Sequence, residues 1–374
     1  MPVGSATEPD TIIVGGGVIG LSLAWELGKR GQSVTVLDRG SSLTTTSWAG
    51  AGILPPAPGE GAAHPSDELS RHARALHTTW ARELLETTGI DNGYVECGGL
   101  YFARGVGEMA SLLGTIELWK EEGLEASPIA KPDLAKRLPH LVRTPVWDQI
   151  QATYELTGEA QIRNPRHLQA LEAACHAVGV SILRDREVNS IRSDHGQWRI
   201  NYCHAGDEKE TACANLCVTG GAWSASLLRP LGIEVGIVPI RGQMLLYKLD
   251  EPLFTSILNE GPQYLVPRTD GRVLVGSTEE EAGFDVTTTP ESLARLKRFA
   301  SDWCPALDDD RLEKSWAGLR PGSFDGFPYL GEIPSHPGLF LAAGHFRSGL
   351  YWSPATAVDG EGTVPPQACK QAED

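Results

Sequence analysis

The sequence predicts an α/β protein in which a Rossmann-like dinucleotide-binding domain is combined with a second, α+β domain built on a mainly antiparallel sheet. Two observations support this prediction. Near the N-terminus a β-branched run, a glycine-rich turn and an apolar helical segment follow one another, as a βαβ unit requires. Between Val238 and Ser277, short apolar runs are separated by turn signals, which is typical of neighbouring antiparallel strands.

The βαβ unit carries a complete G-x-G-x-x-G motif at Gly15, Gly17 and Gly20. Gly15 permits a tight turn, Gly17 admits a pyrophosphate close to the backbone, and Gly20 lets the helix pack closely on the strand. The N–H groups at the start of the helix favour a diphosphate. The second strand ends on Asp38, which is placed to accept hydrogen bonds from a ribose diol. A glycine-rich turn within another α/β fold is the alternative, and the surrounding strand and helix signals argue against it.

Composition limits the classes of function. With 374 residues the chain suggests two domains, and 41% hydrophobic residues are enough for a sizeable core. The net charge of -16 argues against a nucleic-acid or anionic-membrane partner. No apolar run approaches the roughly 18 residues of a membrane span, and residues 1–10 lack the pattern of an export signal. Seven cysteines without a C-x-x-C pair predict a reducing cytoplasm and no metal site.

Two further segments follow Asp38, one rich in small residues and one rich in proline. The first contains Thr46, Ser47, Gly50 and Gly52, whose hydroxyl and backbone groups suit a flat ligand or a phosphate. A flexible polar loop is the alternative, but a second glycine-bearing segment here suits FAD better than NAD. The proline-rich segment 55–61 cannot form regular structure, and we expect a connector rather than a mobile flap.

Helical periodicity is clearest after Pro65, where an apolar stripe that includes Trp80 indicates a core-facing helix ending near Gly89. The segment that follows interrupts the dinucleotide fold, as an inserted domain does. Further strands are expected at 94–104, 180–183, 198–202, 215–218, 238–247, 264–267 and 273–277, and further helices at 108–122, 132–139 and 167–178.

The C-terminal third contains the remaining candidates for a site. Arg320 precedes Pro321 and Gly322, which predicts a guanidinium fixed on a rigid turn and suited to a bidentate carboxylate, or else to a structural ion pair. The small-residue segment 344–349 can approach a flat ring, and Pro354 suggests a helix start aimed at an anion.

These blocks, together with the strand beginning Val238-Pro239-Ile240-Arg241, resemble the glycine oxidases of bacteria, a thiamine-pathway group within the D-amino-acid oxidase-like FAD family. The resemblance extends from about Thr11 to Ala357 and is most specific in segments 316–322 and 344–349. It implies a noncovalently bound FAD in a discontinuous domain of residues 1–90, 150–225 and 315–374. Residues 91–149 and 226–314 are then expected to form the substrate domain.

The resemblance also implies an activity and an assembly. Glycine, sarcosine and small D-amino acids are the implied substrates, oxidised by oxygen to a 2-oxo acid, ammonia and hydrogen peroxide. A cytoplasmic homo-oligomer, a tetramer or a dimer, is implied as well. Arg320 matches the residue that binds the substrate carboxylate, and Tyr264 matches the tyrosine that assists it. The implied cofactor contacts are Gly15, Gly17, Val18, Ile19, Gly20, Asp38, Arg39, Thr46, Ser47, Gly50, Gly52, Val188, Thr219, Gly220, Trp223, Gly344, His345, Phe346, Arg347, Ser348, Gly349 and Leu350.

The chain departs from the family pattern in three places. Pro262 stands where a family member has a histidine, and Glu279 stands at an apolar pocket position, where it pairs with the substrate amine or excludes acidic substrates. The tail after Val358 cannot sustain the expected final helix.

Three rival functions follow from the same motifs: a flavin dehydrogenase that uses another electron acceptor, a non-catalytic flavoprotein, and a covalent sarcosine oxidase. Segment 316–352 contains no cysteine to attach the flavin, which argues against the last.

Overall fold

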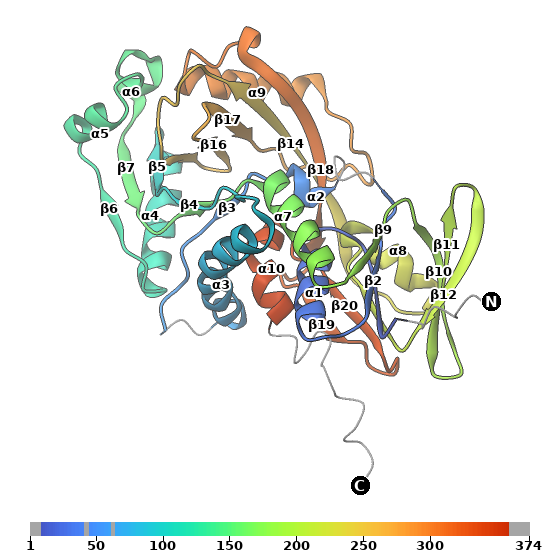
Figure 1. Ribbon diagram of the computed structural model, residues 1–374. Coiled ribbons are helices and arrows are strands. Elements are labelled where there is room, and N and C mark those ends of the chain that lie inside the picture. The colour runs from blue at the N-terminus through green and yellow to red at the C-terminus, as the bar shows by residue number, and fades with distance from the viewer. Residues whose placement is uncertain (1–8, 41–44, 61–63, 359–374) are drawn as a thin grey trace.

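The computed structural model describes residues 9–40, 45–60 and 64–358 of the chain. Two large sheets dominate the described part, one mainly parallel and the other mainly antiparallel. Figure 1 shows the eight-stranded sheet in the upper half of the molecule, with the helices α1, α3 and α10 below it. The predicted fold class, a Rossmann-like domain combined with an antiparallel sheet, is therefore confirmed.

The six-stranded sheet has the order β19-β20-β13-β1-β2-β9. All neighbours in it are parallel except β19 and β20. This arrangement places the carboxyl ends of the parallel strands along one edge, where open α/β sheets bind ligands. Its strands are β1 (Thr11–Val14), β2 (Val34–Leu37), β9 (Ser181–Leu183), β13 (Asn215–Val218), β19 (Tyr329–Glu332) and β20 (Leu339–Ala343).

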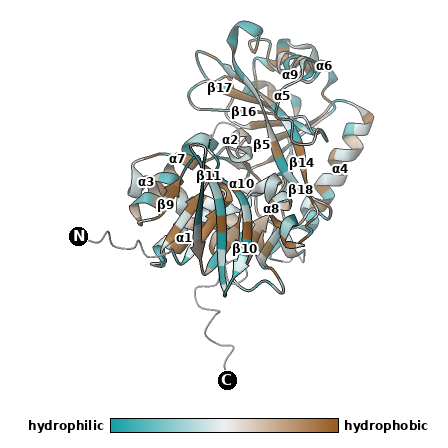
Figure 2. Cartoon of the chain, turned by 90° about the vertical axis from the view of Figure 1, so that its right-hand side faces the viewer, coloured by the Kyte–Doolittle hydropathy of each residue, from teal (hydrophilic) through white to brown (hydrophobic). Residues whose placement is uncertain are grey.

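Both faces of this sheet are covered. Helices pack on one face, where the rings of Trp25 and Trp80 meet edge to face at 4.8 Å. A three-stranded antiparallel sheet, β10-β11-β12, packs on the other face through Ile191, Trp198 and Ile200. Figure 2 shows β10 and β11 toward the viewer, with hydrophilic and hydrophobic segments along both strands. The elements are α1 (Val18–Lys29), α3 (Pro65–Thr88), α7 (Asn164–Ala177), α10 (Gly349–Val358), β10 (Glu187–Asp194), β11 (Gln197–His204) and β12 (Asp207–Cys213).

The eight-stranded sheet has the order β18-β14-β17-β16-β15-β5-β7-β6, and only β15 and β5 run parallel. Helices α5, α6 and α9 cover one face through a core that includes Phe102, Tyr247 and Trp303. The elements are β5 (Gly99–Ala103), β6 (Ala126–Pro128), β7 (Ala152–Leu156), β14 (Ile237–Lys248), β15 (Ile257–Glu260), β16 (Gln263–Pro267), β17 (Arg272–Gly276), β18 (Leu312–Ser323), α5 (Lys131–Arg137), α6 (Pro145–Gln149) and α9 (Pro290–Trp303).

The remaining described elements are short or peripheral, apart from α4. A small sheet, β3-β8-β4, connects the two halves. The predicted helices after Pro65, Val106, Lys131 and Asn164 are confirmed, and the strand expected at 94–104 is divided into β4 and β5. These elements are β3 (Ile53–Leu54), β4 (Val95–Glu96), β8 (Ala160–Gln161), α2 (Thr46–Ala49), α4 (Val106–Glu121), α8 (Ser224–Leu228) and the 3-10 helices Leu141–Arg143, Gly221–Trp223, Arg229–Leu231 and Asp309–Arg311.

The predicted proline-glycine corner after Arg320 is wrong. Arg320, Pro321 and Gly322 lie inside β18, and Pro321 is paired in register with Pro239 of β14. Proline is tolerated here because β18 is an edge strand, so one side of it needs no ladder hydrogen bonds. The Pro321 carbonyl instead accepts a hydrogen bond of 2.9 Å from the Phe346 N–H. A strand, rather than a turn, therefore positions Arg320.

The predicted helix start at Pro354 is also wrong, because α10 begins at Gly349 and contains Pro354 in its interior. Proline has no N–H to donate to the carbonyl four residues earlier. The Ser353 hydroxyl donates to that carbonyl, Leu350 O, at 2.9 Å and replaces the missing bond. The tail prediction concerns residues 359–374, which lie outside the described residues.

We propose the same discontinuous division into two domains, with two shifted boundaries. Strand β7 pairs with β5 and β6, and β18 pairs with β14, so both belong to the eight-stranded sheet. The substrate domain then includes residues up to about 156 in its first part and up to about 323 in its second. No described helix is long and apolar enough to span a membrane.

Candidate active site

A cavity of about 1050 Å³ lies where the carboxyl-end edge of the parallel sheet faces the larger sheet. Ligand pockets commonly occupy roughly 300–1,000 Å³, so this cavity is large enough for an extended ligand. Its walls come from the glycine turn after β1, the segment around α2, the turn after β13, the start of α10, and strands of the eight-stranded sheet.

The glycine turn after β1 is closed by contacts that leave no room for side chains. Gly15 has φ +117°, and a Cβ there would lie 2.6 Å from the Thr219 carbonyl oxygen. A Cβ at Gly20 would lie 1.9 Å from the Gly15 oxygen. The Thr219 hydroxyl donates to the Gly15 oxygen at 2.8 Å and joins the two turns. The turn therefore forms a backbone cradle at the start of α1, which suits a pyrophosphate.

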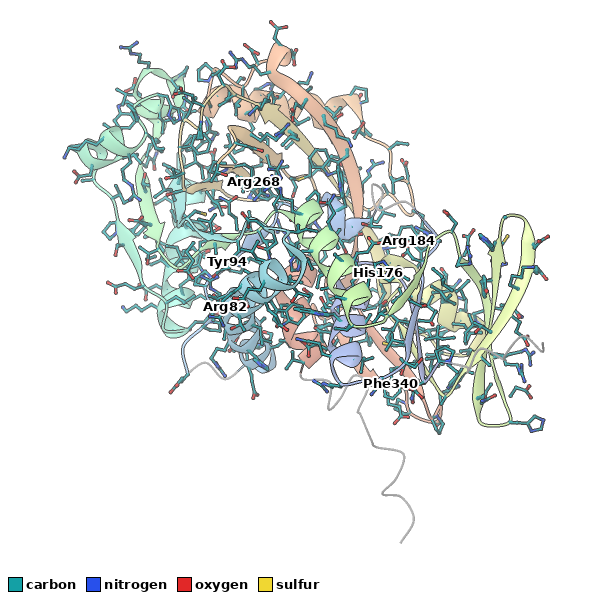
Figure 3. All side chains as sticks on the ribbon, viewed as in Figure 1. Arg82, Tyr94, His176, Arg184, Arg268 and Phe340 are labelled. Carbon is teal, nitrogen blue, oxygen red and sulfur yellow. The ribbon has the colours of Figure 1, made fainter. Side chains whose placement is uncertain are left out.

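Asp38 already accepts three hydrogen bonds beside this cradle. Its carboxylate receives the Gly16 N–H at 2.6 Å, the Gly40 N–H at 3.1 Å and Arg184 Nη1 at 3.0 Å. Figure 3 labels Arg184 next to α7, at the right-hand side of the helices. Asp38 thus ties the glycine turn to the end of β2, and its oxygens retain lone pairs for a ribose diol.

The segment around α2 contributes to the cradle in a different way from the prediction. The Ser47 hydroxyl accepts the Val18 N–H of α1 at 2.9 Å, and the Thr46 hydroxyl donates to the Leu319 carbonyl of β18. The Ser47 bond therefore joins α2 to α1, and the Thr46 bond joins α2 to the eight-stranded sheet. At the opening, the Arg39 guanidinium stacks on the Trp223 ring at 3.7 Å.

Arg320, in β18, lines the cavity on the side of the eight-stranded sheet. Its guanidinium lies over Gly242, where a Cβ would come within 2.2 Å of Nη1. Nη2 donates to the Ser277 hydroxyl at 2.8 Å, and Nη1 donates to the Thr278 carbonyl at 3.1 Å. Burial lowers the pKa of Arg320, and the nearby Tyr264 opposes that shift. In the described part of the chain no carboxylate lies within 4.0 Å of Arg320, so the structural ion pair considered above is not formed there.

Comparison with known proteins gives a consistent result. The family model "FAD dependent oxidoreductase" matches residues 10–358. The chain belongs to the FAD-dependent oxidoreductase family. A glycine oxidase of Pseudomonas putida is 35% identical over 92% of this chain and 91% of its own length, and one of Geobacillus kaustophilus is 31% identical over 93% and 91%. The crystal structure of the Geobacillus kaustophilus enzyme matches with a TM-score of 0.85, 31% identity, and coverage of 94% and 93% of the two chains.

Membership of the FAD-dependent oxidoreductase family agrees with the geometry of the cradle, because the backbone turns fit a dinucleotide. Every predicted site residue lines the cavity except Gly20 and Gly344. Gly20 acts as a packing residue under the turn. Gly344, with φ +86°, packs against Tyr329.

The departures found in the sequence have different places in the FAD-dependent fold. Pro262 lines the cavity, as the resemblance implied. The prediction that Glu279 lies in the pocket is wrong: it is an exposed residue whose carboxylate lies 3.9 Å from Arg347 Nη1. Glu279 follows Ser277 and Thr278, which accept hydrogen bonds from Arg320, and it does not line the cavity.

Sequence reasoning missed a polar group at the far side of the cavity, made of Tyr101, Asn259 and Glu159. The Glu159 side chain is 1% exposed, and the Tyr101 hydroxyl donates to its Oε2 at 2.7 Å. Burial raises the pKa of Glu159 to about 7, and the hydrogen bond from Tyr101 opposes that shift. No motif pointed to these residues, because strands β5 and β15 and the turn before β8 contribute one residue each.

Replacing Asp38 with alanine is expected to weaken FAD retention. The variant removes the carboxylate that accepts hydrogen bonds from the Gly16 N–H and the Arg184 guanidinium. The same carboxylate is the expected acceptor for the ribose diol of FAD. Hydrogen bonds to a charged group are worth about 1.5–3 kcal/mol, so the dissociation constant of FAD should rise by about 10- to 100-fold. Flavin fluorescence during titration of the apoprotein measures this. Asp10→Ala is the control, because Asp10 bonds Ser33 N–H at the opposite end of β1; equal weakening in both variants would contradict the assignment.

Glu159 should make stability depend on pH. Its pKa is raised from 4.5 to about 7 in the folded protein, so the folded state holds more protons between these values and stability falls as pH rises through this window. The full shift corresponds to about 3 kcal/mol. Glu159→Gln removes this titration, so wild type should lose stability relative to the variant between about pH 5 and pH 8. Parallel urea-unfolding profiles of the two FAD-saturated proteins would contradict the expectation.

Proposed function

We propose that this protein oxidises glycine and other small amines, including sarcosine and small D-amino acids, to the 2-oxo acid, ammonia and hydrogen peroxide. The observation that carries the proposal is the partly buried guanidinium of Arg320. It faces a cavity that also contains the FAD cradle, and no described carboxylate pairs with it. A partly buried cation without a carboxylate partner suits a substrate that brings its own carboxylate.

The proposed roles of the residues follow from these positions. Arg320 binds the substrate carboxylate through its two terminal nitrogens, and Tyr264 adds its hydroxyl. This orients the α-carbon, and orientation accounts for a large part of the rate. When bound, FAD supplies the hydride acceptor and returns the electrons to oxygen. No described carboxylate or histidine is assigned as a general base, so the amine is proposed to enter neutral.

The start of α10 supports an anion in the same cavity. Gly349 and Leu350, at the N-terminus of this ten-residue helix, line the wall. A helix N-terminus carries about half a positive charge, which stabilises negative charge developing nearby.

The names of the relatives support glycine as a substrate and thiamine synthesis as the pathway. Several curated relatives are named glycine oxidase. This chain also matches about half of a "Bifunctional protein ThiO/ThiG" of Synechocystis at 32% identity. We propose that the activity serves thiamine biosynthesis.

The principal alternative is a dehydrogenase that passes electrons to another acceptor, because every cofactor residue is shared with that class. Oxygen consumption and peroxide release after addition of glycine to the purified holoenzyme test the proposal directly. Reduction of the flavin by glycine without peroxide would support the dehydrogenase. A flavin that no small amino acid bleaches under anaerobic conditions would support a non-catalytic flavoprotein.

We also propose a cytoplasmic homo-oligomer, a dimer or a tetramer. Helix α4 supports this, because Val106, Leu113 and Leu118 are exposed apolar residues on it. Light scattering during gel filtration measures the subunit number.

A further inference from the structure

The Glu159 carboxylate is buried at the cavity wall without a cation beside it. Its two polar neighbours, Tyr101 and Asn259, are neutral. Among the described residues no lysine, arginine or histidine nitrogen lies within 4.0 Å of it. Asn259 Nδ2 is itself buried and makes no hydrogen bond with described residues. An isolated buried carboxylate is costly in its charged form, so a counter-charge brought by a ligand stabilises it.

The eight-stranded sheet places Glu159 and Arg320 at opposite ends of one row of side chains. Tyr264 pairs in register with Asn259, and Asn259 pairs in register with Tyr101. Residues directly opposite one another on neighbouring strands share a face of the sheet, and all three line the cavity. Tyr264 adjoins Arg320 at one end of this row, and Tyr101 bonds Glu159 at the other.

The spacing of the strands sets the distance between the two tyrosines of this row. Tyr264 and Tyr101 are separated by two strand intervals, or about 10 Å. Glycine carries its amine on the carbon next to its carboxylate, so it cannot reach both ends. A ligand that does so needs a carboxylate and a cation separated by a chain of roughly four to six carbons.

We propose that Glu159 forms a distal subsite that recognises a positively charged group, so that the cavity accepts small amino acids extended by a cationic chain. Such ligands include D-amino acids with an ammonium or guanidinium side chain and glycine substituted on nitrogen with an aminoalkyl group. A ligand with a second carboxylate at its far end is disfavoured, because that group would be repelled by the buried carboxylate of Glu159. The inference rests on the proposed binding of carboxylates by Arg320. It adds recognition of a positively charged group at the other end of the ligand.

The residues around Glu159 leave room for its carboxylate at the cavity wall. Gly99 allows the close approach, since a Cβ there would lie 1.8 Å from Glu159 Oε2. Ile53 of β3 and the following Pro55 also line the cavity. The nearby Glu155 belongs to a different environment, because Arg137 Nη1 bonds it at 2.8 Å and it does not line the cavity.

The test measures binding to the FAD-loaded protein, without turnover. Straight-chain ω-amino carboxylates of increasing length, compared with unsubstituted carboxylates of equal length, are titrated while the flavin absorbance is recorded. We expect wild type to prefer the amino compound by about tenfold or more at one length, a difference typical of a single charge-assisted bond. Glu159→Gln should abolish this preference, and Glu155→Gln should keep it. Tyr101→Phe, which retains the carboxylate, should keep part of it.

Each result has one meaning. Carboxylate binding without a preference for the amino compounds at any length, or a preference that survives in Glu159→Gln, overturns the inference and leaves the proposed oxidase function intact. Absence of binding by every carboxylate, together with no peroxide from glycine, overturns both. If Glu159→Gln fails to fold with FAD, the comparison is made in Tyr101→Phe and in wild type above and below the pH at which Glu159 ionises; an amino-compound preference that does not rise with pH overturns the inference.

Discussion

Arg320→Ala should remove most activity toward glycine while FAD stays bound. The guanidinium lies at the substrate side of the cavity, over Gly242 and away from the glycine turn that cradles the dinucleotide. Truncating one partner of a buried charge pair costs about 2–5 kcal/mol, so kcat/KM should fall by roughly 30- to 4,000-fold. Most of the loss should appear in KM, because the carboxylate contact exists before the reaction begins. Steady-state peroxide release measures kcat and KM, and the flavin-to-protein absorbance ratio measures how much FAD stays bound.

Two controls separate the role of the guanidinium from a general effect of losing an arginine. Arg311→Ala removes an arginine that bonds Asp250 on the surface, and it should leave both kinetic constants near wild type. Arg320→Lys keeps the charge but loses the planar pair of donors, so it should recover only part of the affinity. Near-normal glycine kinetics in Arg320→Ala would contradict the assignment.

Gly20→Ala should have the largest effect on cofactor binding and on stability. The new Cβ would lie 1.9 Å from the Gly15 carbonyl oxygen and 2.7 Å from the Thr219 hydroxyl. The first of these is a backbone atom that cannot rotate away, so α1 must move off β1 and open the cradle. Overpacking costs about 1–3 kcal/mol and sometimes more. We expect the variant to lose FAD during purification and to unfold at a lower temperature than wild type. Flavin absorbance measures the first effect, and thermal denaturation measures the second.

The matched control is Gly114→Ala, the same substitution in α4. Gly114 is exposed in the helix, and a Cβ there meets no atom within 4 Å. Alanine has a higher helix propensity than glycine, so this variant should gain about 0.5–1 kcal/mol. Retention of FAD and of the unfolding temperature in Gly20→Ala would show that the helix does not depend on this close contact.

The local parts of the fold were predictable because the signals for them lie within a few residues. The glycine turn, α1, β2 and the helix stop at Gly89 were all confirmed, since each depends on a backbone conformation or a periodicity that neighbouring residues set. The segment from Arg320 to Gly322 was misread because proline and glycine usually mark turns. Its pairing with β14, more than 70 residues earlier, overrides that preference.

The candidate site also has one part that the sequence predicted and another that only the structure reveals. The dinucleotide cradle is recognisable because one motif supplies most of it. The group formed by Tyr101, Glu159 and Asn259 comes from three distant segments that carry no motif. Likewise, only the structure places Glu279 outside the pocket, because the direction of a side chain after a strand depends on what packs around it.

The sequence alone determined the class of fold and the diphosphate-binding turn, and it pointed to Arg320 as the proposed carboxylate-binding residue, because short-range backbone preferences and a family-wide pattern encode these features. Only the tertiary structure decided what faces Arg320 across the cavity. Strand pairing brings Tyr101 and Asn259 together on the wall that Glu159 also lines, and burial there raises the pKa of Glu159. Burial and long-range register are properties of the folded chain, so no local stretch of sequence contains them.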